Sequence, residues 1–115
     1  MSFEGIYTAY MTGVAGSGLG MFVFKEGQIS GADLSGLTFS GKYSVEGELV
    51  SGIIHYEMPA NSVSITGAEF QRPSGVISVP FELPIEIDPE KTYRINTPIG
   101  PINTKFKKSI GFDER

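Results

Sequence analysis

The chain has 115 residues, with 9 basic and 13 acidic side chains and a formal net charge of −4. This length fits one domain with a buried core, and the 40% share of hydrophobic residues argues against disorder. The absence of cysteine excludes disulfides, cysteine-based zinc sites and cysteine nucleophiles. A single histidine excludes a multi-histidine metal site within one chain.

The N-terminus lacks the features of a secretory signal, because it has no basic start and Glu4 interrupts its apolar residues. The longest apolar stretches, such as residues 21–24, are too short to cross a membrane as a helix. We therefore expect a cytoplasmic protein that does not associate with membranes.

Residues 1–90 carry three basic and eleven acidic side chains, a net charge of −8, whereas residues 91–115 carry six basic and two acidic ones, a net charge of +4. The acidic body argues against direct binding of nucleic acid.

Glycine and proline recur along the whole sequence, and hydrophobic residues alternate with a period of two, which is typical of strands. In the first half of the chain, strands are predicted over residues 3–13, 19–25, 28–33, 37–43 and 48–58. The first strand has Tyr7, Ala9 and Met11 on one face. Glu26 and Gly27 form a two-residue hairpin turn, because glycine tolerates the positive φ that such turns require.

Proline and glycine divide the second half of the chain into shorter elements. Residues 59–61 interrupt the pattern, residues 68–75 form a loop, and strands are predicted over residues 63–67, 76–83, 92–97 and 102–110. Pro80 and Pro84 cannot donate ladder hydrogen bonds, so their strand is expected at an edge of the sheet or bulged. Residues 88–91 form a turn.

Strands at this spacing, joined by short turns, predict an all-β protein with an antiparallel meander. About eight such strands close into a small barrel, and closure removes exposed edges that would aggregate. Residues 1–115 are therefore interpreted as a single β-barrel domain. A two-sheet sandwich is the alternative.

Few residues indicate catalysis. Residues 13–20 are rich in glycine, but a strand follows them where a phosphate-binding loop requires a helix. His55 lies on a predicted strand and is interpreted as a half-buried structural side chain, with general-base catalysis beside Tyr56 or Glu57 as the alternative. We expect a protein that is not an enzyme and has no catalytic residues, metal or cofactor.

Two groups of acidic residues indicate surface chemistry. Glu46 and Glu48 are two positions apart, so they can share a face and form a partner-binding patch. The second group, Glu82, Glu86 and Asp88, is interpreted as solvated acid around a turn.

Aromatic residues are the main candidates for an interior or an interface. In a small barrel they usually fill the core, but eight strands leave room for one small ligand. The candidate residues for a cavity or a dimer surface are Tyr7, Met11, Phe22, Phe24, Tyr43 and Tyr56. They leave open the binding of a small apolar, lipid-like molecule.

Several short motifs resemble the GrlR family, small negative regulators of type III secretion genes in enteric bacteria. They are Gly5-Ile6-Tyr7 at the start of a strand, Lys25-Glu26-Gly27, Ile29-Ser30-Gly31-Ala32-Asp33 and Gly41-Lys42-Tyr43-Ser44. The resemblance covers residues 5–56, about half the chain. It implies a lipocalin-like barrel, a homodimer and regulation by protein–protein contact, with a transcriptional activator as the partner.

The same resemblance implies an acidic loop that binds the partner. Its position here is Ser44-Val45-Glu46-Gly47-Glu48, where Glu46 and Glu48 keep the acid and Val45 and Gly47 depart from the alternating Glu and Asp of the family. We therefore expect the fold to carry over even where the partner does not.

Overall fold

The computed structural model describes residues 3–58, 62–63, 65–67, 69–70 and 75–112. The predicted interruption at residues 59–61 and most of the predicted loop at 68–75 lie outside the described residues. The strands are β1 (Gly5–Gly13), β2 (Gly16–Lys25), β3 (Gln28–Asp33), β4 (Thr38–Glu46), β5 (Leu49–Met58), β6 (Ser62–Val63), β7 (Glu69–Phe70), β8 (Gly75–Pro84), β9 (Tyr93–Thr97) and β10 (Gly100–Gly111).

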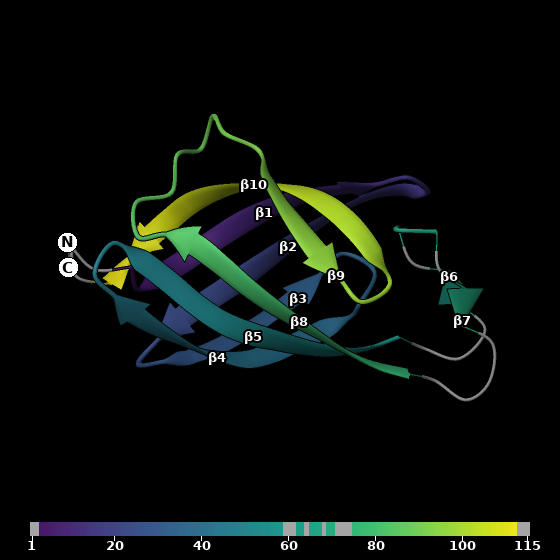
Figure 1. Ribbon diagram of the computed structural model, residues 1–115, viewed down its shortest axis with the longest axis horizontal. Coiled ribbons are helices and arrows are strands. Elements are labelled where there is room, and N and C mark those ends of the chain that lie inside the picture. Colours follow the sequence, from purple (N-terminus) through teal and green to yellow (C-terminus); the bar gives the residue numbers. More distant parts are fainter. Residues whose placement is uncertain (1–2, 59–61, 64, 68, 71–74, 113–115) are drawn as a thin grey trace.

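Eight of these strands form one antiparallel sheet that curls into a nearly closed barrel (Figure 1). The strand order is β8-β5-β4-β3-β2-β1-β10-β9, so each strand pairs with a neighbour in the chain except where β1 meets β10 and β5 meets β8. The prediction of an all-β, eight-stranded antiparallel barrel is confirmed. Strands β6 and β7 form a separate two-stranded hairpin inserted between β5 and β8.

The barrel has a seam between β8 and β9, the two strands at the ends of the sheet order. The terminal position of β8 agrees with the edge strand predicted from Pro80 and Pro84, whose nitrogens carry no hydrogen. The loop at residues 85–92 connects the two strands and rises away from the barrel wall (Figure 1). The pairing of β1 with β10 makes the sheet continuous, and the seam between β8 and β9 is bridged by side-chain packing of Ile77 and Val79 against Ile95.

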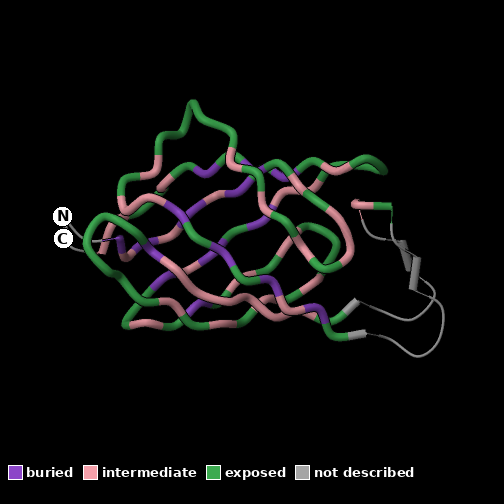
Figure 2. Tube along the Cα trace, viewed as in Figure 1, coloured by how far each residue is buried: buried purple, intermediate pink, exposed green. Residues whose placement is uncertain are grey.

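Burial changes from residue to residue along the strands (Figure 2), as expected where successive side chains point to opposite faces of the sheet. Tyr7, Ala9 and Met11 of β1, predicted to share one face, are all buried, whereas Tyr10 on the opposite face is 56% exposed. Both residues of the predicted turn, Glu26 and Gly27, have positive φ (50° and 77°). This geometry matches the right-handed twist of the flanking strands.

Several predicted boundaries shift. The predicted loop at residues 14–18 is shorter, because β2 already begins at Gly16. Strand β4 extends through Glu46, so the turn lies at Gly47 and Glu48. The hairpin of β6 and β7 replaces the single strand predicted at residues 63–67 and uses part of the predicted loop. In each case, backbone pairing with the neighbouring strand extended or redirected a segment that local propensity alone left open.

A cluster of aromatic rings, the aromatic plug, fills part of the interior near the end where β1 begins and β10 ends. This end carries the N and C marks in Figure 1. The members of the plug are Phe3, Tyr7, Phe24 and Tyr43. The Phe24 ring lies edge-on to Phe3 (4.9 Å between centroids) and to Tyr43 (5.3 Å). The Tyr7 hydroxyl donates a 2.7 Å hydrogen bond to the carbonyl oxygen of Phe3, so the buried phenol is satisfied.

The plug predicts a stability effect for a residue that precedes the first strand. Phe3 is 3% exposed, so Phe3→Ala should lower the free energy of unfolding by about 3–5 kcal/mol, measured by urea unfolding. Tyr10→Ala removes an exposed aromatic side chain and should change it by at most about 0.5 kcal/mol. A loss below about 1 kcal/mol for Phe3→Ala would show that the plug does not depend on this ring.

Candidate functional site

Another part of the barrel interior is hollow. A cavity of about 670 Å³ lies there and is partly open to solvent. The reason is visible along β2, whose inward positions change from Phe24 and Phe22 near the plug to Gly20 and Gly18 toward the opposite end. A Cβ added at Gly18 would meet only Met11 Cε, at 3.7 Å, within 4 Å. The cavity therefore forms where inward glycines replace aromatic rings.

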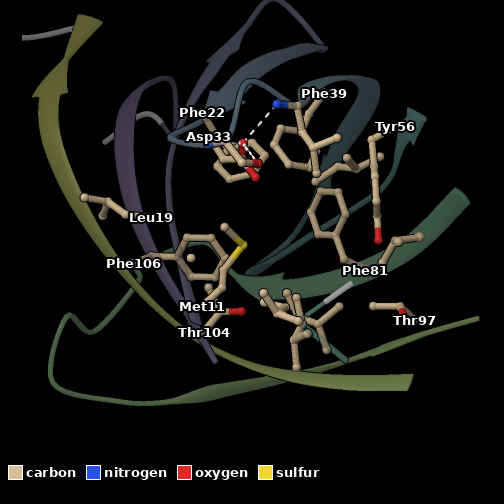
Figure 3. A pocket seen from close by; sticks show the side chains of 18 of the residues that line it. Met11, Leu19, Phe22, Asp33, Phe39, Tyr56, Phe81, Thr97, Thr104 and Phe106 are labelled. Atoms are coloured by element: carbon tan, nitrogen blue, oxygen red, sulfur yellow. Dashed lines mark hydrogen bonds between the residues drawn. The ribbon is translucent and has the colours of Figure 1, made fainter. Parts of the chain in front are cut away.

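The cavity wall is predominantly apolar, and its side chains come from strands around the barrel (Figure 3). Aromatic rings of Phe22, Phe39, Phe81 and Phe106 line it together with aliphatic residues. The aliphatic lining is Leu19, Leu34, Leu37, Ile54, Ile65, Val79, Leu83, Ile95 and Ile102. Such a wall is typical of a site for a small apolar molecule.

One rim of the cavity is a tight loop between β3 and β4. The Asp33 Oδ1 atom accepts hydrogen bonds from the backbone nitrogens of Ser35 and Leu37, both 3.0 Å, and from Ser35 Oγ at 2.7 Å. Gly36 in this loop has a φ of 93°, which glycine adopts without steric cost. The carboxylate is thus engaged in holding the rim.

A second part of the rim is the tip of the β6–β7 hairpin, residues 65–67. The Ala15 nitrogen donates a 2.8 Å hydrogen bond to the carbonyl oxygen of Ile65, which joins the tip to the β1–β2 turn. Gly13 lies so close to the Ile65 backbone that a side chain there would collide with it. Ile65 and Thr66 both line the cavity, so this tip forms part of its mouth.

The structure divides the six residues proposed for a cavity or dimer surface. Met11, Phe22, Phe24 and Tyr56 line the cavity. Tyr7 and Tyr43 belong instead to the aromatic plug: Tyr7 is 2% exposed, and Tyr43 is half-buried. Within the monomer, none of the four cavity-lining residues is an exposed large hydrophobic side chain.

Sequence reasoning missed the polar residues of the cavity, above all Asp33, Thr97 and Thr104. The Thr97 hydroxyl donates to the Gly100 carbonyl oxygen at 2.5 Å and accepts from the Ile99 nitrogen at 3.2 Å. Thr104 is 2% exposed. The sequence does contain a signal for Thr104. This threonine lies between Ile102 and Phe106 at an inward strand position, where alternation predicts an apolar residue.

The acidic pair lies at the opposite end of the barrel from the cavity mouth. Glu46 ends β4 and Glu48 lies in the turn before β5, near the end that holds the termini (Figure 1). Both side chains are exposed, and their neighbours Val45 and Leu49 are 45% and 46% exposed. The turn thus presents carboxylates and apolar side chains together.

His55 lies outside the cavity. It alternates along β5 with the cavity-lining residues Ile54 and Tyr56, so it occupies the outer face of the barrel. Its Nδ1 atom is 2.8 Å from Ser78 Oγ on the paired strand β8, a contact that orients the imidazole.

Among the described residues there is no group of three or more His, Cys, Asp or Glu side chains suited to a metal ion. In that same part of the chain, no helix has the length and apolar character needed to cross a membrane.

Comparisons with protein-family models, with curated proteins and with solved structures give no match for this chain.

Burial affects the ionisation of two tyrosines. Desolvation raises the pKa of Tyr56 above its ordinary value of 10.0. Desolvation also raises the pKa of Tyr43, with smaller contributions from the carboxylates of Glu4 and Glu26. In both cases the folded protein favours the neutral phenol.

These shifts predict a loss of stability at high pH. Above the ordinary tyrosine pKa the unfolded chain releases phenolic protons that the folded protein retains. The free energy of unfolding should therefore fall as the pH rises above 10, until the folded-state pKa values are passed. Tyr56→Phe should reduce this fall and remove one late-titrating phenol from the five tyrosines, measured by phenolate absorbance. Tyr10→Phe, which alters an exposed phenol, is the control, and an equal effect of both variants would contradict the assignment.

Proposed function

We propose that the protein binds a small apolar molecule inside the barrel and acts as its carrier or sensor. The observation that carries this proposal is the cavity of about 670 Å³ with a predominantly apolar wall. Its volume lies within the range of about 300–1,000 Å³ that is typical of ligand pockets. Burial of an apolar ligand against these rings would supply about 25 cal/mol for each Å² of apolar surface removed from water.

Filling the cavity tests this proposal. Gly18 faces the cavity and has free space around a Cβ, so Gly18→Leu adds a side chain to the interior without a backbone collision. We expect it to weaken binding of the neutral fluorescent probe N-phenyl-1-naphthylamine by about tenfold or more, the loss of roughly 1.4 kcal/mol. The readout is probe fluorescence in a titration.

Ser30→Leu is the matched control, because Ser30 is exposed on the outer face of β3. It should leave probe binding unchanged. If Gly18→Leu binds the probe as tightly as the unaltered protein, the probe does not enter the cavity and the proposal fails.

A second candidate function is regulation by protein–protein contact, in the manner of the GrlR-type negative regulators of type III secretion genes that the sequence resembles. The exposed turn with Glu46 and Glu48, flanked by partly exposed Val45 and Leu49, favours it. We propose that this turn contacts a protein partner, such as a transcriptional activator, in the bacterial cytoplasm. This proposed contact at the turn does not depend on a ligand in the cavity.

The homodimer implied by the same resemblance has a candidate surface on the outside of β1, β2 and β10. Tyr10, Met21 and Ile110 are 56%, 51% and 52% exposed there. The register places Ile6 beside both Ile110 and Val23, so apolar side chains from three strands are neighbours. A face of this kind is typical of a protein contact.

Charge reversal tests the regulatory contact. Glu46→Lys combined with Glu48→Lys should reduce co-purification with a co-expressed activator of secretion genes by about tenfold or more, because the attraction becomes repulsion. Glu86→Lys combined with Glu90→Lys makes the same charge change at two other exposed positions and should have little effect. Equal loss in both variants would assign the effect to net charge and contradict a specific contact at the turn.

A further inference from the structure

The cavity contains one polar atom whose environment is unusual. Thr104 on β10 is 2% exposed, and its side chain points into the barrel interior (Figure 3). Within the described part of the chain, its Oγ1 atom has no hydrogen-bond partner, and it is the one buried side-chain oxygen or nitrogen atom of which this is true. Leaving a buried hydroxyl unsatisfied costs about 1–3 kcal/mol. A bound molecule that forms a hydrogen bond with Thr104 Oγ1 would remove this cost.

Thr97 and Asp33, two other polar residues of the cavity, differ from Thr104 in this respect. Thr97 satisfies its hydroxyl with two local backbone groups, and the Asp33 Oδ1 atom accepts three hydrogen bonds within the rim loop. The strand neighbours of Thr104 are Ile102 and Phe106, and its cross-strand partners are Met11 and Tyr93. The hydroxyl is therefore an isolated polar point on an apolar wall, deep in the barrel.

The charges around the cavity restrict the class of ligand that it can bind. Among the described residues that line the cavity there is no Lys, Arg or His, and the one carboxylate is that of Asp33 at the rim. Of the three lysines of β10, Lys105 and Lys107 are exposed on its outer face, and the half-buried Lys108 pairs with Tyr7 of the plug and does not line the cavity. A fatty-acid carboxylate inside the barrel would therefore lose its hydration without gaining a cation, which is strongly unfavourable.

We propose that the cavity takes an uncharged apolar molecule with a single hydrogen-bonding oxygen, an alcohol or carbonyl group, and that this oxygen bonds to Thr104 Oγ1. The hydrocarbon part lies against the rings of Phe22, Phe39 and Phe81. The inference rests on the proposed function, because it names the class of ligand that the cavity selects. Its chemistry follows from the unsatisfied hydroxyl and from the lack of a cation in the wall.

The test compares three ligands of equal chain length that differ only in the head group: decanol, decanoate and decylamine. Each displaces N-phenyl-1-naphthylamine from the full-length protein near neutral pH, where decanoate is anionic and decylamine is cationic. We expect decanol to compete about tenfold or more better than decanoate. Thr104→Val, which has nearly the same shape without the hydroxyl, should weaken decanol about fivefold to tenfold relative to the affinity of the probe measured in the same variant, while Thr104→Ser should keep most of the decanol affinity.

A stability measurement guards against misfolding of the variant. Because Thr104→Val removes an unsatisfied buried hydroxyl, the unfolding midpoint of the ligand-free protein should be unchanged or higher. A lower midpoint would mean that the hydroxyl already has a partner, such as a buried water, and would overturn the inference. Equal decanol affinity in Thr104→Val and the unaltered protein would overturn it as well.

The remaining outcomes separate this inference from the proposed function. Tighter binding of decylamine that is lost in Asp33→Asn would assign the cavity to a cationic amphiphile and overturn the neutral class while keeping the ligand-binding function. If decanoate binds as tightly as decanol, the cavity accepts an anionic amphiphile. That result would also overturn the neutral class while keeping the ligand-binding function. If the probe does not bind the unaltered protein at all, both the proposed function and this inference fail.

Discussion

The antiparallel pairing of β1 with β10 is the constraint on which the rest of the structure depends. Its register runs from Gly5 opposite Gly111 to Thr12 opposite Asn103, so it joins the first and last strands along most of their length. Strands β8 and β9 occupy the two ends of the sheet order, and the barrel is not closed by hydrogen bonds there. Without the β1–β10 ladder the sheet would be open at two places, and its inward side chains would not enclose a common volume.

Because the sheet curls into a nearly closed barrel, all inward-facing side chains share one small interior. The sizes of these side chains divide it into a filled part and a hollow part. Phe3, Tyr7 and Tyr43 pack edge-on and stacked around Phe24 at one end, and Phe24 also borders the cavity. At the other end the inward glycines of β2 leave a cavity of about 670 Å³. Ring packing at one end stabilises the fold that the cavity at the other end weakens, since a void forgoes the dispersion contacts of its lining. A molecule bound in the hollow part would restore those contacts and should stabilise the barrel by mass action.

The two proposed activities occupy opposite ends of the same barrel. The cavity mouth is formed by the β3–β4 loop and the tip of the β6–β7 hairpin, whereas the turn with Glu46 and Glu48 lies beside the chain termini (Figure 1). Strands β4 and β5 run between the two ends, and Phe39, Ile54 and Tyr56 on them contribute to the cavity or the rings packed around it. Ligand binding and partner contact are compatible functions of one molecule in this geometry.

The sequence by itself determined the fold class, the shared face of Tyr7, Ala9 and Met11 on β1, the Glu26–Gly27 turn and the restriction of the proline-bearing strand to an edge or a bulge. These features follow from local rules: alternation with a period of two, the positive φ that glycine tolerates, and the missing hydrogen on proline nitrogen. Only the tertiary structure decided that Phe22 lines a cavity while Tyr7 fills a plug, and that Thr104 is left without a partner on the wall of that cavity. It also decided where the seam lies and that Ile65 borders the mouth. The physical reason is that these properties depend on which residues of distant strands share one space, and alternation gives the face of a residue but not its neighbours across the barrel.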